Sequence, residues 1–199
     1  MPKLLHSTAS PYSAKVRMAA AYAGIAYEAV AVETSADPEL LIASNPLGKI
    51  PTFIPDEGPA IYDSRAITQF LNRQSGNKLF PRNAARRTEA EIMEALADGT
   101  MDCLLAHVME RRSHAPEKVE QAWLDRQWSK VERSLDHLVA HTPNLPSRIH
   151  VGHIAVRALL SYLSLRFEGK WEKGRSKLKR WAARFDAKFP ELATLVSTA

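Results

Sequence analysis

The chain has 199 residues, of which 45% are hydrophobic and 25% are charged, the ordinary composition of a soluble globular protein. Its formal net charge of +5 reflects 27 basic and 22 acidic residues, an excess too small to indicate a nucleic-acid partner by itself. No apolar run approaches the roughly 20 residues that span a bilayer, and the N-terminus turns polar too soon for a signal peptide. The single cysteine, Cys103, excludes an intramolecular disulfide, so we expect a cytoplasmic protein.

Up to about residue 78, short apolar runs alternate with helical patches and turn residues. The predicted elements, in chain order, are a strand at 4–5, a helix over 16–23, a strand over 27–32, a short helix after Asp37, strands at 52–54 and 60–62, and a helix that starts after Asp63. This order, β-α-β-α-β-β-α, indicates a small α/β domain over residues 1–78.

Residues 79–84 read as a linker, and beyond them the sequence shows only helical periodicity. Helices are predicted over 86–112, 117–140 and 149–167. The last is the most apolar segment, but Arg157 and Arg166 interrupt it, so it predicts a core helix rather than a membrane span. We therefore expect an all-α domain over residues 85–199.

A basic cluster lies between residues 170 and 188. Its spacing around Trp181 and Phe185 predicts an amphipathic helix with a solvated basic face. Attraction of anionic ligands or partners is the alternative interpretation.

Three short motifs of the first domain carry chemistry. The first is the stretch from Ser10 to Ser13, between the first strand and the first helix. A hydroxyl here lies near a helix N-terminus, where free N–H groups and the helix dipole favour an anion. Taken alone, Ser10 followed by proline is equally typical of a simple helix cap.

The second motif spans residues 45–51 and ends in Ile50-Pro51. A cis bond before Pro51 would leave the Ile50 backbone free to pair with an extended peptide, although the motif by itself is also typical of a plain turn. The third motif, Asp63-Ser64, precedes a helix. It is either a cap or a pair that holds the amino and carboxylate groups of an α-amino acid.

The order and spacing of these motifs resemble the glutathione-binding motifs of the glutathione transferase superfamily. The N-terminal motifs are Ser10-Pro11-Tyr12, Asn45-Pro46-Leu47-Gly48-Lys49-Ile50-Pro51 and Asp63-Ser64-Arg65-Ala66-Ile67. The C-terminal stretches that resemble bacterial members are 95–102, 122–127 and 152–156. The resemblance therefore covers essentially the whole chain. It implies a thioredoxin-like N-terminal domain, an all-helical C-terminal domain, a homodimer, glutathione as co-substrate and no metal.

The resemblance also implies a role for each residue of the glutathione site. Ser10 would be catalytic and donate a hydrogen bond to the glutathione sulfur. The Ile50 backbone, shaped by a cis Pro51, would pair with the cysteinyl unit. Asp63 and Ser64 would hold the γ-glutamyl end. Lys49 is placed to meet a carboxylate of glutathione.

A second, small electrophilic or hydrophobic substrate would bind between the domains. The residues that the resemblance suggests for this acceptor pocket are Tyr12, Met101, Leu105 and Val108. Attack by a glutathione thiolate on such a substrate, or reduction of a peroxide or disulfide, is the expected activity. A non-catalytic ligand carrier or protein-interaction module on the same fold is the alternative.

Serine rather than cysteine at position 10 favours conjugation over mixed-disulfide chemistry. Nearby hydroxyls could donate to the sulfur in its place: those of Ser7, Thr8, Tyr12 and Ser13.

Histidines and other reactive residues outside the three motifs have simpler interpretations. His150 and His153 occupy positions where many family members carry a capping Ser or Thr and an Asp, so the usual capping box is not expected. His137 and His141 have metal-binding spacing but no third ligand in the sequence, which favours surface histidines. Cys103 is expected to be a buried small hydrophobe. The four tryptophans are expected to pack rather than to stack on bases.

Overall fold

The computed structural model describes all 199 residues, and its N-terminal part contains a three-stranded sheet. The strands are β1 (Lys3–His6), β2 (Glu28–Ala31) and β3 (Thr52–Ile54), in the order β2-β1-β3. β1 pairs in parallel with β2 and antiparallel with β3. Because β1 is central, its apolar side chains Leu4 and Leu5 are completely buried.

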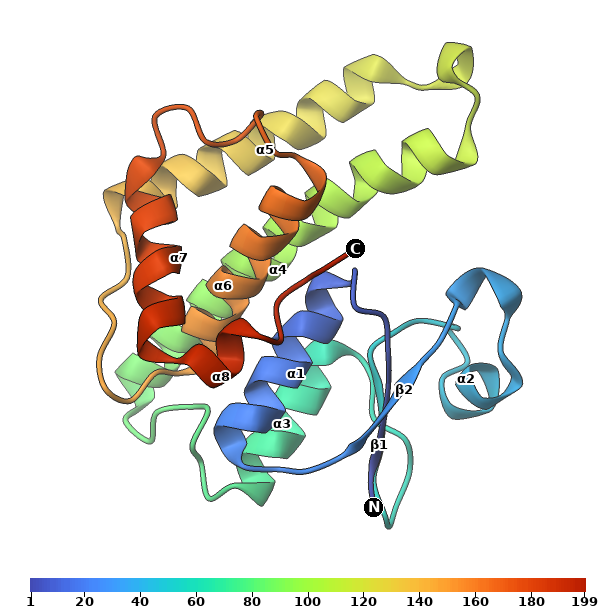
Figure 1. Ribbon diagram of the computed structural model, residues 1–199, viewed down its shortest axis with the longest axis vertical. Coiled ribbons are helices and arrows are strands. Elements are labelled where there is room, and N and C mark those ends of the chain that lie inside the picture. The colour runs from blue at the N-terminus through green and yellow to red at the C-terminus, as the bar shows by residue number, and fades with distance from the viewer.

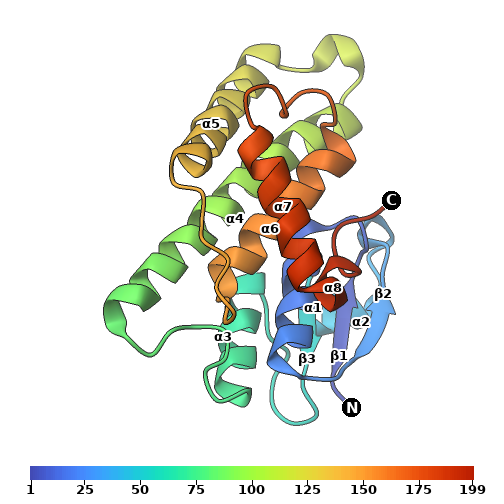
Figure 2. The ribbon, with the colours of Figure 1, turned by 60° about the vertical axis from the view of Figure 1, so that its left-hand side comes forward.

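Three helices accompany this sheet: α1 (Pro11–Ala23), α2 (Glu39–Ser44) and α3 (Ser64–Gln74). α1 and α3 lie side by side between the sheet and the C-terminal helices, whereas α2 lies on the other side of the sheet (Figures 1 and 2). The helix predicted to begin at residue 16 begins at Pro11, because Ser10 caps it and proline suits the first helical position.

The strand predicted at residues 60–62 does not form. Ile61 makes a single antiparallel bridge with Phe53, in which each N–H donates to the other residue's carbonyl at 2.8–2.9 Å. Pro59 lacks a backbone N–H, and α3 begins at Ser64, so the segment is too short to extend the ladder.

The C-terminal part is entirely helical. The helices are α4 (Ala84–Ser113), α5 (Gln121–Ala140), α6 (Val151–Arg166), α7 (Ser176–Lys188) and α8 (Pro190–Ala193). Two 3₁₀ turns occur in the chain, η1 (Thr34–Ala36) between β2 and α2 and η2 (Pro116–Lys118) between α4 and α5. α5 begins four residues later than predicted because η2 and a short extended segment precede it. α7 buries Trp181 and Phe185 as predicted.

α6 is the centre of the helical part, and every residue from Val151 to Leu163 is buried. It packs so closely against α4 that its residue Gly152 has no space for a side chain. A Cβ placed there would lie 2.7 Å from Met93 Cβ and 2.9 Å from the Ala90 carbonyl oxygen. The chain contains no helix that is both long and apolar enough to cross a membrane.

The N-terminus of α6 is capped by two histidines, which form a capping box in place of the usual one. His150 Nδ1 accepts a hydrogen bond from the Gly152 N–H at 3.2 Å, and His153 Nδ1 accepts from the His150 N–H at 3.3 Å. His153 Nε2 lies 2.9 Å from the Asn144 carbonyl oxygen. A neutral imidazole offers one acceptor and one donor, so these two rings replace the usual hydroxyl and carboxylate.

The C-terminal tail returns to the first domain and ends beside the β1–α1 loop (Figure 1). The Arg17 guanidinium donates to the carbonyls of Leu195 and Val196 at 2.6 and 2.9 Å. The Thr198 N–H donates to the Thr8 carbonyl at 3.1 Å. These bonds tie the tail to α1 and to the loop that leads to Ser10.

Candidate functional site

The three sequence motifs meet at one edge of the sheet. In the antiparallel pair, Leu5 near the end of β1 lies opposite Thr52 at the start of β3, so the loop after β1 and the segment before β3 leave the same edge. Because Ile61 runs antiparallel to β3, the chain then returns toward that edge before Asp63 and Ser64.

Ser10 caps α1 with its side chain and keeps a free donor. Its Oγ accepts a hydrogen bond from the Ser13 N–H at 3.2 Å. A serine hydroxyl has two acceptor sites and one donor, and the Ser10 O–H donates to no group of the protein. A partly exposed donor therefore stands at a helix N-terminus, where an anion is favoured.

Among the other hydroxyls near Ser10, only that of Tyr12 donates a hydrogen bond within the protein; those of Ser7 and Ser13 accept one, as Ser10 does. Ser13 is completely buried, and its Oγ lies 3.5 Å from the Ser7 N–H. Ser7 Oγ caps the Ala9 N–H at 3.4 Å. The Tyr12 hydroxyl donates to an Asp102 carboxylate oxygen on α4, and burial, followed by that hydrogen bond, raises the pKa of Tyr12 well above its usual range.

The loop before β3 is held by a buried asparagine that the sequence reading did not single out. Asn45 donates from Nδ2 to the Lys49 carbonyl at 2.8 Å and to Thr52 Oγ1 at 3.1 Å, and its Oδ1 accepts from the Leu47 N–H at 3.0 Å. The only sequence signal for this role is its place at the head of the 45–51 motif.

The Ile50–Pro51 peptide bond is cis, as predicted. Neither the N–H nor the carbonyl of Ile50 makes a hydrogen bond within the protein. Both groups are therefore available to an extended peptide, in the manner of an added strand. The Lys49 side chain is exposed and forms no ion pair.

The third motif forms the N-terminus of α3. Asp63 is the N-cap residue, and its Oδ1 accepts from the Arg65 N–H at 3.0 Å. Asp63 is exposed and Ser64 is buried. The Tyr62–Asp63 peptide bond is also cis. The first turn of α3 thus presents a carboxylate beside a helix N-terminus, an arrangement that suits an α-amino acid end.

Behind this edge lies a buried ion network that joins three helices. Lys15 on α1 is 0% exposed, and its Nζ lies 3.0 Å from a Glu94 oxygen and 2.7 Å from an Asp98 oxygen on α4. Arg65 Nε on α3 donates to the same Asp98 oxygen at 2.9 Å. Burial, opposed by the charge of Lys15, raises the pKa of Glu94.

Two hydrogen bonds to α4 hold the N-terminal turns of α1 and α3. Arg65 binds Asp98, and Tyr12 binds Asp102, one helical turn further on. The N-termini of α1 and α3 therefore face adjacent turns of α4.

The residues suggested for an acceptor pocket lie along the same stretch of α4. Leu105 and Val108 are partly exposed, whereas Met101 is 0% exposed and belongs to the core. Met101 therefore offers no surface to a substrate here, and the expectation for that residue is corrected. Tyr12 is partly exposed beside Asp102.

The remaining candidate residues are His137, His141 and Cys103. His137 and His141 are exposed, and no group of three or more His, Cys, Asp or Glu residues is placed to hold a metal ion. Cys103 is half-buried rather than fully buried as expected, and burial raises the pKa of its thiol.

Known proteins resemble both the sequence and the structure of the chain. A family model for the glutathione S-transferase N-terminal domain matches residues 4–79. Over 169 residues the chain is 30% identical to the uncharacterized GST-like protein YibF of Escherichia coli K12, covering 82% of this chain and 83% of that protein.

Solved structures extend this likeness to both domains. A glutathione transferase family member from Pseudomonas fluorescens Pf-5, solved with bound glutathione, is 33% identical with a TM-score of 0.89 and covers 100% of both chains. A glutathione S-transferase from Methylobacillus flagellatus KT, also solved with glutathione, is 34% identical with a TM-score of 0.86, covering 96% of this chain and 98% of that one.

A thioredoxin-like domain followed by a helical domain, with these motifs gathered at one sheet edge, defines a protein of the glutathione transferase type. The chain belongs to the glutathione S-transferase family.

Proposed function

We propose that the protein is a glutathione transferase that binds glutathione at the sheet edge and activates its thiol for attack on a small electrophile. Glutathione-bound relatives at 33% and 34% identity support the choice of co-substrate. The observation that carries the proposal is the unused O–H donor of Ser10 at the N-terminus of α1.

Each part of glutathione has a matching group at this edge. The open N–H and carbonyl of Ile50 pair with the cysteinyl backbone. Ser64 and the N-terminus of α3 receive the γ-glutamyl carboxylate, and Asp63 pairs with its amino group. Lys49 meets the remaining carboxylate. With the peptide held in this way, the sulfur lies at Ser10.

The proposed chemistry requires a thiolate near neutral pH. A free thiol has a pKa of about 8.5, and lowering it by two units takes about 2.7 kcal/mol of preferential stabilisation of the anion. A charge-assisted hydrogen bond from Ser10, together with the dipole of α1, is of this size. The thiolate then attacks an electrophilic carbon, a disulfide or a peroxide.

The buried network supports the site mechanically. Lys15, Arg65 and Asp98 fix the N-termini of α1 and α3 against α4. The N-terminal turns of α1 and α3 are therefore fixed relative to each other before a ligand binds. A ligand that contacts both Ser10 and Ser64 pays a smaller ordering cost as a result.

The finer assignments rest on the family resemblance. We propose a cytoplasmic homodimer with domains over 1–78 and 85–199, a role in detoxification, and an acceptor pocket that includes Tyr12, Leu105 and Val108. The alternative is a non-catalytic carrier on the same fold. The free donor of Ser10 favours the enzyme, because a carrier has no need of a donor at the sulfur.

Turnover and binding measured together separate the two functions. Glutathione affinity is measured by calorimetry, and conjugation is measured with a panel of aryl halides and activated alkenes, for the wild type and for Ser10→Ala. An enzyme of the proposed kind loses most of its rate in the variant while its glutathione Kd changes little. Binding without turnover of any electrophile in the wild type would support the carrier.

A further inference from the structure

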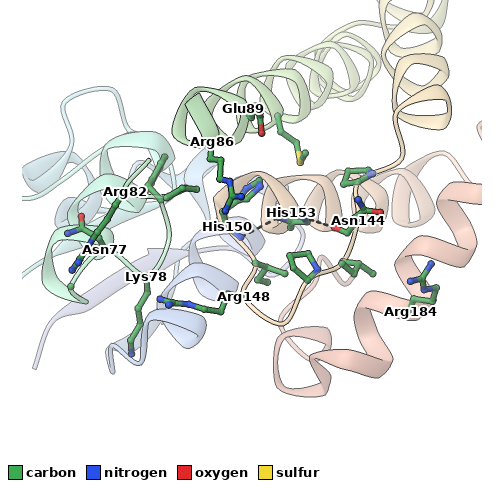
Figure 3. Close-up of a pocket in the computed structure, with 18 residues that line it drawn as sticks. Asn77, Lys78, Arg82, Arg86, Glu89, Asn144, Arg148, His150, His153 and Arg184 are labelled. Atoms are coloured by element: carbon green, nitrogen blue, oxygen red, sulfur yellow. Dashed lines mark hydrogen bonds between the residues drawn. The ribbon is translucent and has the colours of Figure 1, made fainter. Parts of the chain in front are cut away.

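A second concave site lies away from the three glutathione motifs. A cavity of about 1060 Å³ opens between the linker, the first turns of α4, the α5–α6 loop and α7. Its walls include no residue of the predicted glutathione site. Figure 3 shows side chains from these four segments around it.

The charged groups around this cavity are almost all positive. Four arginines line it, one from each of the four segments, and Glu89 is the only acidic residue. The arginines are Arg82, Arg86, Arg148 and Arg184. All four are exposed, and neither they nor Glu89 form an ion pair, so their charge is not neutralised within the protein. Lys78 also lines the cavity, but its ammonium group donates to the Ala23 carbonyl at 2.9 Å.

The backbone that carries these arginines is anchored at each segment. The Leu79 and Phe80 N–H groups donate to Asn72 Oδ1 in the linker. Asn83 caps α4 by accepting from the Arg86 N–H at 3.1 Å.

The α5–α6 loop is anchored in the same way. Trp181 Nε1 donates to the Pro143 carbonyl at 2.7 Å, and the Ile149 N–H donates to the Tyr22 hydroxyl at 3.0 Å. The backbone of the cavity wall is therefore anchored, and only the arginine side chains need to be ordered when a ligand binds.

The lining also indicates what kind of ligand fits. Only four of the 18 lining residues are hydrophobic. The one phenylalanine, tyrosine or tryptophan of the wall, Phe80, is 1% exposed, so none of these larger aromatic faces is available to stack on a nucleobase. Planar guanidinium groups match phosphate oxygens in pairs. Because the four arginines come from four separate segments, they suit a ligand that carries negative charge at more than one point.

We propose that this cavity binds a small, multiply phosphorylated molecule. The site is independent of the glutathione site, and its occupation requires no change in the thiol chemistry. Arg184 belongs to the basic 170–188 segment. The proposed site is therefore one way in which that segment would attract an anionic ligand.

The probe for this site is inorganic tripolyphosphate, titrated into the full chain by calorimetry at low salt. Arg148→Gln/Arg184→Gln removes two cations of the cavity. Arg126→Gln/Arg180→Gln removes two exposed arginines of α5 and α7 that do not line it, so the loss of net charge is the same. Thermal unfolding verifies that both double variants are folded.

We expect saturable binding at one site per chain, weakened by about tenfold or more in the cavity variant because charge-assisted hydrogen bonds are lost. The control variant should change the Kd less than about twofold, and glutathione binding should be unchanged in both. Absence of saturable binding, or equal weakening in both variants, would overturn the proposal. Equally tight binding of a short DNA duplex that depends on Arg148 and Arg184 would show a nucleic-acid surface instead, and would also overturn it.

Discussion

The ammonium group of Lys15 lies 2.7 Å from an Asp98 carboxylate oxygen, and the Lys15 side chain is completely inaccessible to solvent. The pair joins α1 to α4 directly behind the edge where the three motifs meet. Glu94 completes the contact with a second carboxylate at 3.0 Å. A buried charge with its partner removed is costly, which makes this pair sensitive to substitution.

Lys15→Met should destabilise the protein by about 3–5 kcal/mol, because it leaves the buried Glu94 without its cation and Asp98 with Arg65 alone. Urea unfolding measures the effect. Lys130→Met is the matched control, since that lysine is exposed on α5 and donates only to Gln127; its expected effect is within about 0.5 kcal/mol. A loss below about 1 kcal/mol for Lys15→Met would show that the network contributes little.

Gly152→Ala should destabilise the protein by about 1–3 kcal/mol, because the new Cβ meets Met93 and the Ala90 carbonyl at distances that force α4 and α6 apart. Gly99 on α4 provides the opposite case. A Cβ there meets nothing within 4 Å, so Gly99→Ala should stabilise the helix by up to about 1 kcal/mol. Thermal unfolding compares the two, and equal effects would contradict the packing of α6 described above.

The histidine caps of α6 should make stability depend on pH. Burial, with the neighbouring His153, lowers the pKa of His150 to about 4, and burial also lowers the pKa of His153. The unfolded chain therefore takes up protons near pH 6.5 that the folded chain resists, so stability is fully present above that pH and falls below it.

The expected loss for this pair is about 1 kcal/mol per pH unit between pH 6.5 and 4, less than the full linkage value because solvent still reaches His150. Urea unfolding at pH 7.5 and 5.5 measures it. His150→Ser/His153→Asp supplies a hydroxyl and a carboxylate as caps and should reduce the loss. An unchanged pH dependence in that variant would show that other groups, such as His6 or His107, cause it.

Sequence patterns predicted those parts of the fold that local signals determine. The amphipathic spacing around Trp181 and Phe185 gave a helix with its aromatic side buried, and the apolar 149–167 segment gave the core helix. The predicted strand at 60–62 was wrong, because a short apolar run does not show whether the flanking residues, here Pro59 and the start of α3, allow a ladder of backbone hydrogen bonds. Cis Pro51 followed from the family resemblance rather than from the turn itself.

The buried network could not be predicted, for a physical reason. Glu94 and Asp98 are four residues apart on a helix that also carries many exposed charges, and nothing local distinguishes these two from solvated ones. Their burial depends on how α1 and α3 meet α4, which is a tertiary property. The same holds for Met101, whose position on α4 placed it near the site but whose side chain packs in the core.

The central claim is that Ser10 stabilises the thiolate of bound glutathione. Ultraviolet absorbance of the thiolate, followed against pH for the complex, tests it most directly. Tyr12→Phe serves as control, because the Tyr12 hydroxyl already donates to Asp102. We predict a thiolate present at neutral pH in the wild type and in Tyr12→Phe, and a pKa raised toward that of free glutathione in Ser10→Ala. A thiolate that persists in Ser10→Ala, or bound glutathione that stays protonated in the wild type, would contradict the account.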